Sequence, residues 1–209
     1  MKWFVLKKGL ISYSPAHVGA FLKSSPEIDL PDLQFVFTPA SYTEGMIGKL
    51  QNIPGITCGV WQSRPQSRGY VRALSNHIKD APLIQPNYLK ETIDQNVLIQ
   101  GVKICRDLLK TSNMKKISIK ETLPGENVKT DSEILNFVKN NGATVYHAIG
   151  SCRMGIDKDA VVDADLKLNG VENLRVADAS IMPTMPSGNT NAATLMIAEK
   201  ASDLIKKDK

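Results

Sequence analysis

The order of strand-like and helix-like segments is the feature that most limits how this chain of 209 residues can fold. Alternation of apolar and polar residues over short stretches is typical of strands, whereas apolar residues recurring every third or fourth position are typical of helices. The two kinds of segment are mixed along the chain, without the strand–helix–strand rhythm of a parallel sheet. The sequence therefore predicts an α+β fold, in which helices pack on a mostly antiparallel sheet.

Several short segments have the composition of strands. They are residues 33–38, 56–62, 70–74, 116–120, 143–146, 161–166 and 173–177. Turn residues fill positions 63–69, so we expect 56–62 and 70–74 to pair as an antiparallel hairpin. Residues 80–88 contain prolines and are typical of an extended linker, and the stretch from Gly45 to Gly48 favours a flexible surface loop.

Helices are predicted at residues 16–24, 89–109, 130–142 and 191–206. In the second of these, apolar residues such as Val97 and Leu108 recur at helical spacing. Gly101 lies inside that helix, where glycine costs about 1 kcal/mol relative to alanine. The third helix begins with Thr130 followed three residues later by Glu133, which is a capping-box pattern.

Charge and composition argue against several classes of protein. The net charge of +5 is mild, and no basic run interleaved with aromatic residues supports nucleic-acid binding. No apolar run approaches the roughly 18 residues of a membrane helix. Cys58, Cys105 and Cys152 are odd in number and widely spaced, which argues against a disulfide framework and against a structural metal site. We expect a soluble, cytoplasmic protein in a reducing compartment.

His147 is the main candidate for chemistry. It follows the strand-like residues 143–146 and precedes Gly150, and rigid scaffolds present reactive side chains at such element ends. Its imidazole is suited to accepting or holding a proton near neutral pH; the alternative is an ordinary histidine satisfied by one hydrogen bond. Cys152, five residues later, lacks the context of a cysteine nucleophile and further metal ligands, so packing is its expected role.

Two further positions suggest a ligand. Asp178 ends an apolar segment and is followed by the small residues Ala179 and Ser180, which let a ligand approach the backbone or let Asp178 cap a turn. Residues 187–190 precede the last helix, whose first N–H groups and positive dipole end point toward whatever lies ahead. This loop is either an ordinary helix cap or a site for developing negative charge.

The three segments 146–155, 174–180 and 187–200 together resemble the C-terminal region of the glucose–methanol–choline (GMC) oxidoreductases, particularly the choline dehydrogenase-like members. Residues 30–35, 67–71 and 86–89 are also similar to the substrate domain of that family, so the resemblance covers nearly the whole chain. It implies an FAD-dependent enzyme in which hydride moves from an alcohol carbon to flavin N5.

The resemblance also implies a role for each matching residue. His147 matches the active-site histidine that accepts the alcohol proton, and Asn189 matches its partner position, where an amide can hydrogen-bond the substrate oxygen. Asp178, Ala179, Asn189 and Thr190 match the segments that contact FAD. No metal ligands are implied. The expected partners are a small-molecule alcohol and an N-terminal FAD-binding portion.

The family's Gly-x-Gly-x-x-Gly dinucleotide fingerprint is a clear departure, because no such motif occurs in this sequence. We therefore expect residues 1–160 to form an N-terminally truncated substrate-binding domain, and residues 161–209 to supply a strand and helix that complete an FAD-binding domain. Two alternatives stay open: a flavin-containing hydroxynitrile lyase that cleaves cyanohydrins, and a non-catalytic fragment unable to bind FAD alone.

Overall fold

The computed structural model describes residues 5–6, 14, 16, 18–43 and 49–208. The expected loop from Gly45 to Gly48 lies outside them. The chain divides into two compact units, the first formed by residues 1–62 and 91–143 and the second by residues 63–90 and 144–209. The domain boundary expected at residue 160 concerns the domains of a longer protein, and it stays a prediction.

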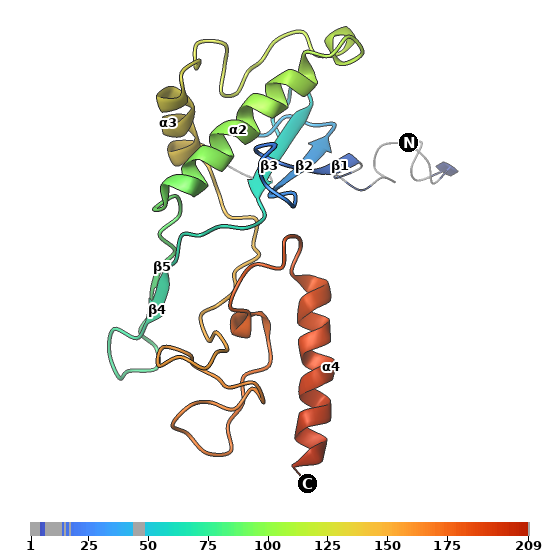
Figure 1. The fold of residues 1–209 in the computed structure, drawn as a ribbon. Coiled ribbons are helices and arrows are strands. Elements are labelled where there is room, and N and C mark those ends of the chain that lie inside the picture. Colours follow the sequence, from blue (N-terminus) through green and yellow to red (C-terminus); the bar gives the residue numbers. More distant parts are fainter. Residues whose placement is uncertain (1–4, 7–13, 15, 17, 44–48, 209) are drawn as a thin grey trace. The chain divides into compact units, whose positions relative to one another are not determined.

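The first unit contains a three-stranded antiparallel sheet in the order β1-β2-β3 (Figure 1). The strands are β1 (Val18–Leu22), β2 (Leu33–Thr38) and β3 (Thr57–Gln62), with Phe35 opposite both Ala20 and Val60. The strands predicted at 33–38 and 56–62 are confirmed. The helix predicted at 16–24 is wrong, because a helix this short is marginal by itself, whereas pairing with β2 satisfies the backbone of Val18–Leu22.

One long helix, α2 (Thr92–Leu109), lies across the sheet in Figure 1 and confirms the predicted helix at 89–109. Val97 and Cys105 on α2 join the fully buried Leu33 and Phe35 of β2 in one apolar cluster. Gly101 has a packing reason: a Cβ there would lie 2.9 Å from Val60 Cγ2. The glycine therefore lets the helix backbone approach β3.

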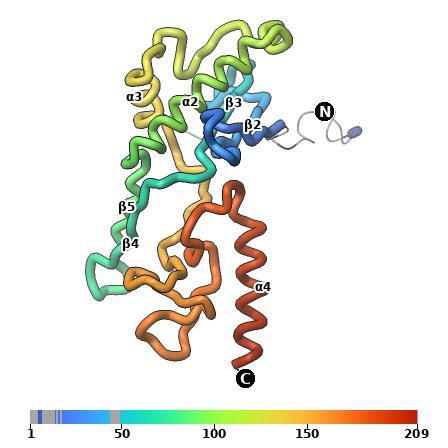
Figure 2. The backbone as a smooth tube through the Cα atoms, viewed as in Figure 1, coloured from blue at the N-terminus to red at the C-terminus, as the bar shows by residue number. Residues whose placement is uncertain are grey.

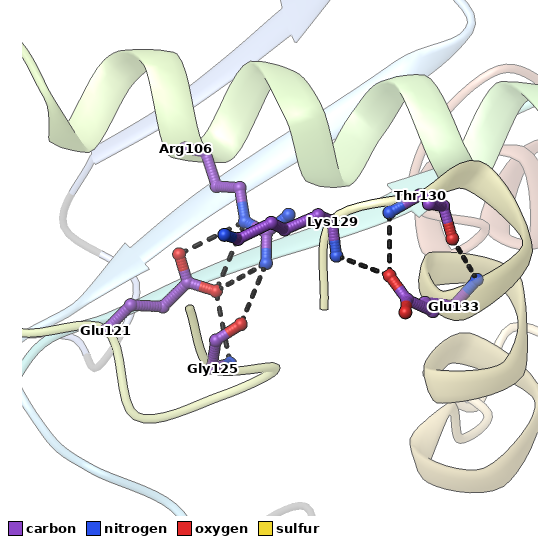
Figure 3. A network of polar contacts seen from close by, with 6 residues as sticks. All are labelled: Arg106, Glu121, Gly125, Lys129, Thr130 and Glu133. Carbon is purple, nitrogen blue, oxygen red and sulfur yellow. Dashed lines mark hydrogen bonds and ion pairs between the residues drawn. The ribbon is translucent and has the colours of Figure 1, made fainter. Parts of the chain in front are cut away.

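The helix α3 (Asp131–Asn141) packs its buried Ile134 against Ile99 and Val102 of α2. Its capping box is confirmed and is drawn in Figure 3. Thr130 Oγ1 accepts from the Glu133 backbone N–H at 3.2 Å, and Glu133 Oε2 accepts from the Thr130 backbone N–H at 2.8 Å.

An ion pair fixes the segment between these helices (Figure 3). Arg106 Nη2 lies 2.8 Å from Glu121 Oε1, and the same oxygen accepts from the Gly125 backbone N–H at 3.1 Å. The strand predicted at 116–120 is wrong: a short 3-10 helix, η2 (Met114–Lys116), is followed by an irregular segment. Ile119 in that segment is 97% exposed. The alternation of apolar and polar residues at 116–120 therefore does not correspond to a buried face of a sheet.

The second unit contains a small antiparallel ladder of β4 (Tyr70–Arg72) and β5 (Leu83–Gln85). The expected pairing of 56–62 with 70–74 is therefore wrong, because β3 pairs with β2 and β4 pairs with β5. Residues 80–88, expected as a linker, contain β5. Turn residues at 63–69 permit a hairpin between the flanking segments. They do not decide which strands pair, because pairing depends on which strand offers a matching partner.

Long loops make up much of the second unit before the helix α4 (Asn191–Lys207), which confirms the last predicted helix (Figure 2). The strand-like segments 161–166 and 173–177 form isolated bridges, such as Val162 opposite Leu168 and Lys167 opposite Arg175, rather than regular strands. Residues 143–146 form no strand. Positive φ values at Leu166 (64°), Gly170 (79°) and Asn173 (60°) interrupt any longer ladder.

The core of the second unit is built from α4 and these bridged loops. Its buried apolar residues are Val162, Leu166, Ile181, Met182, Ile197 and Ala201. This core holds the loop after residue 146 and the start of α4 in one compact body. Helices combined with antiparallel pairing confirm the α+β class.

Candidate active site

His147 is held between two side chains that lie more than forty residues later in the chain. Its Nδ1 lies 3.0 Å from Thr190 Oγ1, and its Nε2 lies 2.8 Å from Asn189 Nδ2. His147 is half-buried, Thr190 is buried and Asn189 is exposed. The structure therefore brings together three of the residues named from the sequence, all within the second unit.

The two contacts fit one tautomer of the neutral imidazole. An amide nitrogen of asparagine only donates, so in the tautomer that satisfies this contact Nε2 of His147 accepts from Asn189 Nδ2. In the neutral ring the proton then lies on Nδ1, which donates to the hydroxyl oxygen of Thr190. The basic nitrogen consequently lies on the side of the exposed Asn189, where it can accept a proton from a small hydroxyl compound.

The loop that carries His147 is shaped by its backbone. Tyr146 has φ 61° and Gly150 has φ 83°, two left-handed residues that bracket the histidine. The loop is then fastened to the short 3-10 helix η3 (Ala179–Ile181): the Cys152 N–H donates to Ser180 O at 3.0 Å, and the Met154 N–H donates to Ile181 O at 2.8 Å.

The loop that carries Asn189 is also in a restricted conformation. Ser187 has φ 63°, and its Oγ accepts from Arg64 Nε at 2.8 Å. Thr190 is the N-cap residue of α4, yet its side chain makes no cap hydrogen bond. Its hydroxyl contacts His147 instead. Tyr146 and Ser187 are two of the six described non-glycine residues with positive φ, and each lies in one of the two segments of the site.

Asp178 is the N-cap residue of η3, and Ala179 is the first residue of η3. Asp178 Oδ1 accepts from the Ser180 backbone N–H at 2.7 Å and caps this short helix. The hydroxyl and then the backbone N–H of Ser180 lower the pKa of Asp178 below its ordinary value. Asp178 is exposed and Ala179 half-buried. The two residues that follow, Ser180 and Ile181, accept the backbone hydrogen bonds of Cys152 and Met154 from the His147 loop.

Sequence reasoning missed three features of this site. Arg64 lies in a turn segment and contacts Ser187 across 123 positions, which no local pattern signals. The left-handed backbone at Tyr146 and Ser187 was also not foreseen, although Ser187 precedes a glycine. The contact between Thr190 and His147 was missed because threonine before a helix is usually read as a cap.

Other site types find no support among the described residues. The described residues include no group of three or more His, Cys, Asp or Glu side chains placed to hold a metal ion. Across the same part of the chain, no helix has both the length and the apolar character needed to cross a membrane. A pocket lined by Lys120, Thr122 and Asn127 lies in the first unit, and none of the site residues lines it.

Comparison with known sequences gives a family match over most of the chain. The C-terminal family model for GMC oxidoreductases matches residues 65–198. An alcohol dehydrogenase [acceptor] of Pseudomonas putida is 42% identical over 199 residues, which are 95% of this chain and 36% of the relative. The mitochondrial choline dehydrogenase of Homo sapiens is 38% identical over 209 residues, 99% of this chain and 35% of the relative.

Solved structures agree with the sequence matches. Pyridoxine 4-oxidase from Mesorbium loti superposes with a TM-score of 0.81 at 28% identity, covering 90% of this chain and 37% of that one. A fungal aryl-alcohol oxidase gives a TM-score of 0.70 at 25% identity, covering 86% of this chain and 28% of that one. The chain thus spans about a third of the length of the relatives it matches. On these matches, the chain belongs to the GMC oxidoreductases, a family of FAD-dependent enzymes acting on CH–OH groups.

Proposed function

We propose that this chain supplies the catalytic, substrate-facing part of an FAD-dependent oxidoreductase that oxidises an alcohol, with His147 as the proton acceptor. One observation carries the proposal: Nε2 of His147 lies 2.8 Å from Asn189 Nδ2, while Nδ1 lies 3.0 Å from Thr190 Oγ1. The names of its relatives, an alcohol dehydrogenase and a choline dehydrogenase, point to the same substrate class.

The two site residues have different tasks. A substrate hydroxyl that replaces the direct contact between Asn189 and His147 accepts a hydrogen bond from the Asn189 amide and donates its own proton to Nε2. Asn189 cannot take that proton, which leaves His147 as the base. We propose that Thr190 holds the ring orientation, with its hydroxyl oxygen accepting from Nδ1 in the same tautomer.

The residues fit an FAD ring in chemical terms. Thr190 leaves the N-terminus of α4 without a side-chain cap, so the positive end of the helix dipole favours negative charge nearby. Ala179 offers a small side chain next to Asp178. We propose that Asp178, Ala179, Asn189 and Thr190 contact the cofactor. FAD, when bound, supplies the acceptor for the hydride that leaves the alcohol carbon.

The rest of the cofactor site requires protein outside this sequence. A pyrophosphate-binding glycine fingerprint does not occur in these 209 residues, and the relatives are about three times longer. Leu195 and Met196 on α4 are 60% and 61% exposed. We propose that an FAD-binding portion is the partner that covers these side chains.

The test is a chimera that supplies the missing portion. The matching third of the Pseudomonas putida relative is replaced by residues 1–209, and the purified chimera is examined for bound flavin absorbance and for its bleaching by alcohols under anaerobic conditions. We expect flavin binding and alcohol-dependent bleaching. His147→Ala is expected to keep the flavin and lose bleaching rate by about a hundredfold or more, the usual contribution of a general base.

His77 provides a matched control, since it is an exposed histidine of the same unit paired with Asp80. His77→Ala should leave the bleaching rate unchanged. Equal bleaching by the His147→Ala and unsubstituted chimeras would refute the assigned base. Cleavage of cyanohydrins without any alcohol-dependent bleaching would replace the oxidoreductase assignment with a lyase, and a chimera that folds but binds no flavin would favour a non-catalytic fragment.

A further inference from the structure

Two cysteines that are far apart in the sequence meet in the first unit. Cys58 lies on β3 and Cys105 on α2, and their sulfur atoms are 3.1 Å apart. Both thiols are free. A disulfide bond is about 2.05 Å long, so the two sulfurs need to approach by only about 1 Å to bond. Cys105 Sγ also lies 3.7 Å from the carbonyl oxygen of Cys58, which keeps it directed at β3.

The two thiols have different surroundings. Cys105 is 8% exposed and belongs to the apolar core with Leu33 and Phe35, whereas Cys58 is only half-buried at the edge of that cluster. A small oxidant from solvent therefore reaches Cys58 first. Cys105 lies directly behind it and is shielded from the same reagent.

The contact between the two sulfurs also shifts the pKa values of the two thiols in opposite directions. When Cys58 ionises, the S–H of Cys105 donates to it, and this hydrogen bond lowers the pKa of Cys58 although burial acts in the opposite direction. The hydrogen bond with Cys58 and burial both raise the pKa of Cys105. An accessible, more acidic thiol beside a resolving thiol is the arrangement found in redox-sensitive cysteine pairs.

We propose that Cys58 and Cys105 form a reversible oxidation site, in which a peroxide converts the two thiols into a disulfide that links β3 to α2. The Cys58 thiolate attacks one peroxide oxygen, the O–O bond breaks, and sulfenic acid forms with release of one water. The Cys105 sulfur then attacks the Cys58 sulfur and releases a second water. Two sulfurs are each oxidised by one electron, and both oxygens of hydrogen peroxide are reduced to water.

The proposal is independent of flavin chemistry, because both cysteines lie in the first unit and the candidate active site lies in the second. Cys152 serves as an internal reference. It is half-buried like Cys58, but it lies in the second unit. An unspecific oxidation would modify Cys152 as readily as Cys58.

The experiment uses the complete chain after full reduction. One equivalent of hydrogen peroxide is added, remaining thiols are alkylated, and intact and peptide masses are measured. We expect the loss of two hydrogens, about 2 Da, with a peptide cross-link between Cys58 and Cys105 and with Cys152 alkylated. Dithiothreitol should return both thiols. Oxidation of Cys152 before the pair, or overoxidation of Cys58 without a cross-link, would overturn the proposal.

Variants sharpen the result. Cys105→Ser should leave Cys58 to accumulate as a sulfenic or more oxidised acid without a cross-link, and Cys152→Ser should cross-link like the unsubstituted chain. The mass measurement on the unsubstituted chain needs no variant, so it decides the question even if Cys105→Ser fails to fold. A cross-link that persists in Cys58→Ser would show that other sulfurs react, which would also refute the assignment.

Discussion

Replacing Gly101 by alanine has two opposing effects of similar size on the free energy of unfolding. Alanine gains about 1 kcal/mol over glycine in a helix interior. The added Cβ, however, would lie 2.9 Å from Val60 Cγ2 and 3.2 Å from Leu33 Cδ2, well inside the ordinary carbon–carbon contact of about 3.5–4.0 Å. Val60 is stiff at χ1 and Leu33 is fully buried, so neither moves freely.

Overpacking of this kind costs about 1–3 kcal/mol. Taking about 2 kcal/mol for it and subtracting the gain of about 1 kcal/mol, we expect Gly101→Ala to lower the free energy of unfolding by about 1 kcal/mol. Denaturant titration of the complete chain, followed by the fluorescence of Trp61 next to Val60, measures this change. The fitted m-value should stay constant.

A double-mutant cycle separates the two effects. Val60→Ala removes the nearest contact of the new Cβ and leaves only Leu33 Cδ2 at 3.2 Å, so adding Gly101→Ala in that background should raise stability, by at most about 1 kcal/mol. The effect of Gly101→Ala on stability is thus expected to change from destabilising, with Val60 present, to stabilising in the Val60→Ala background. If Gly101→Ala is stabilising in both backgrounds, the close approach of α2 to β3 is refuted.

Three further predictions concern hydrogen bonds in the two units. In the chimera, Thr190→Val removes the acceptor of the His147 Nδ1 proton and should slow alcohol-dependent flavin bleaching about tenfold or more without loss of flavin, whereas Thr190→Ser should retain the rate. Thr130→Ala should cost about 1 kcal/mol in denaturant titration, and a neutral result would exclude the capping box as a stabilising element. Hydrogen bonds from the backbones of Thr130 and Lys129 lower the pKa of Glu133. The contribution of Glu133 to stability is therefore complete above the ordinary glutamate pKa and is lost as the pH falls through the lowered pKa. Glu133→Gln should flatten the acid side of the stability–pH curve, and an unchanged curve would contradict this.

Local patterns were sufficient where a segment carries its own reasons to form. The helix α2 has apolar residues at helical spacing, α3 begins with a capping box, and α4 has one apolar face. Each of these features acts within a few residues, so the sequence predicts the helix without knowledge of the fold. The strands β2 and β3 were also predicted from local pattern, the alternation of apolar and polar residues, although Leu33, Gln34 and Phe35 of β2 are all buried.

Pairing depends on partners that a local pattern does not name. β4 pairs with β5 rather than with β3, and Val18–Leu22 is a strand because β2 lies beside it. Apolar and polar side chains alternate along residues 116–120 as they do in a strand, but no strand among the described residues pairs with this segment. The backbone of a strand must find its hydrogen bonds on another segment, and only the folded chain shows which segment that is.

The residue types of the candidate site were recognisable in the sequence, whereas their geometry was not. His147 was singled out from its place at the end of a strand-like segment, and Asn189 from the family resemblance. The two contacts that His147 makes with Asn189 and Thr190 span more than forty positions, and no local pattern announces them. Likewise, Cys58 and Cys105 were read as unrelated thiols and lie 3.1 Å apart. The sequence by itself determined the α+β class, the helices and the chemical groups that are present. Tertiary structure decided which groups meet, because distances between segments are set by packing and not by separation along the chain.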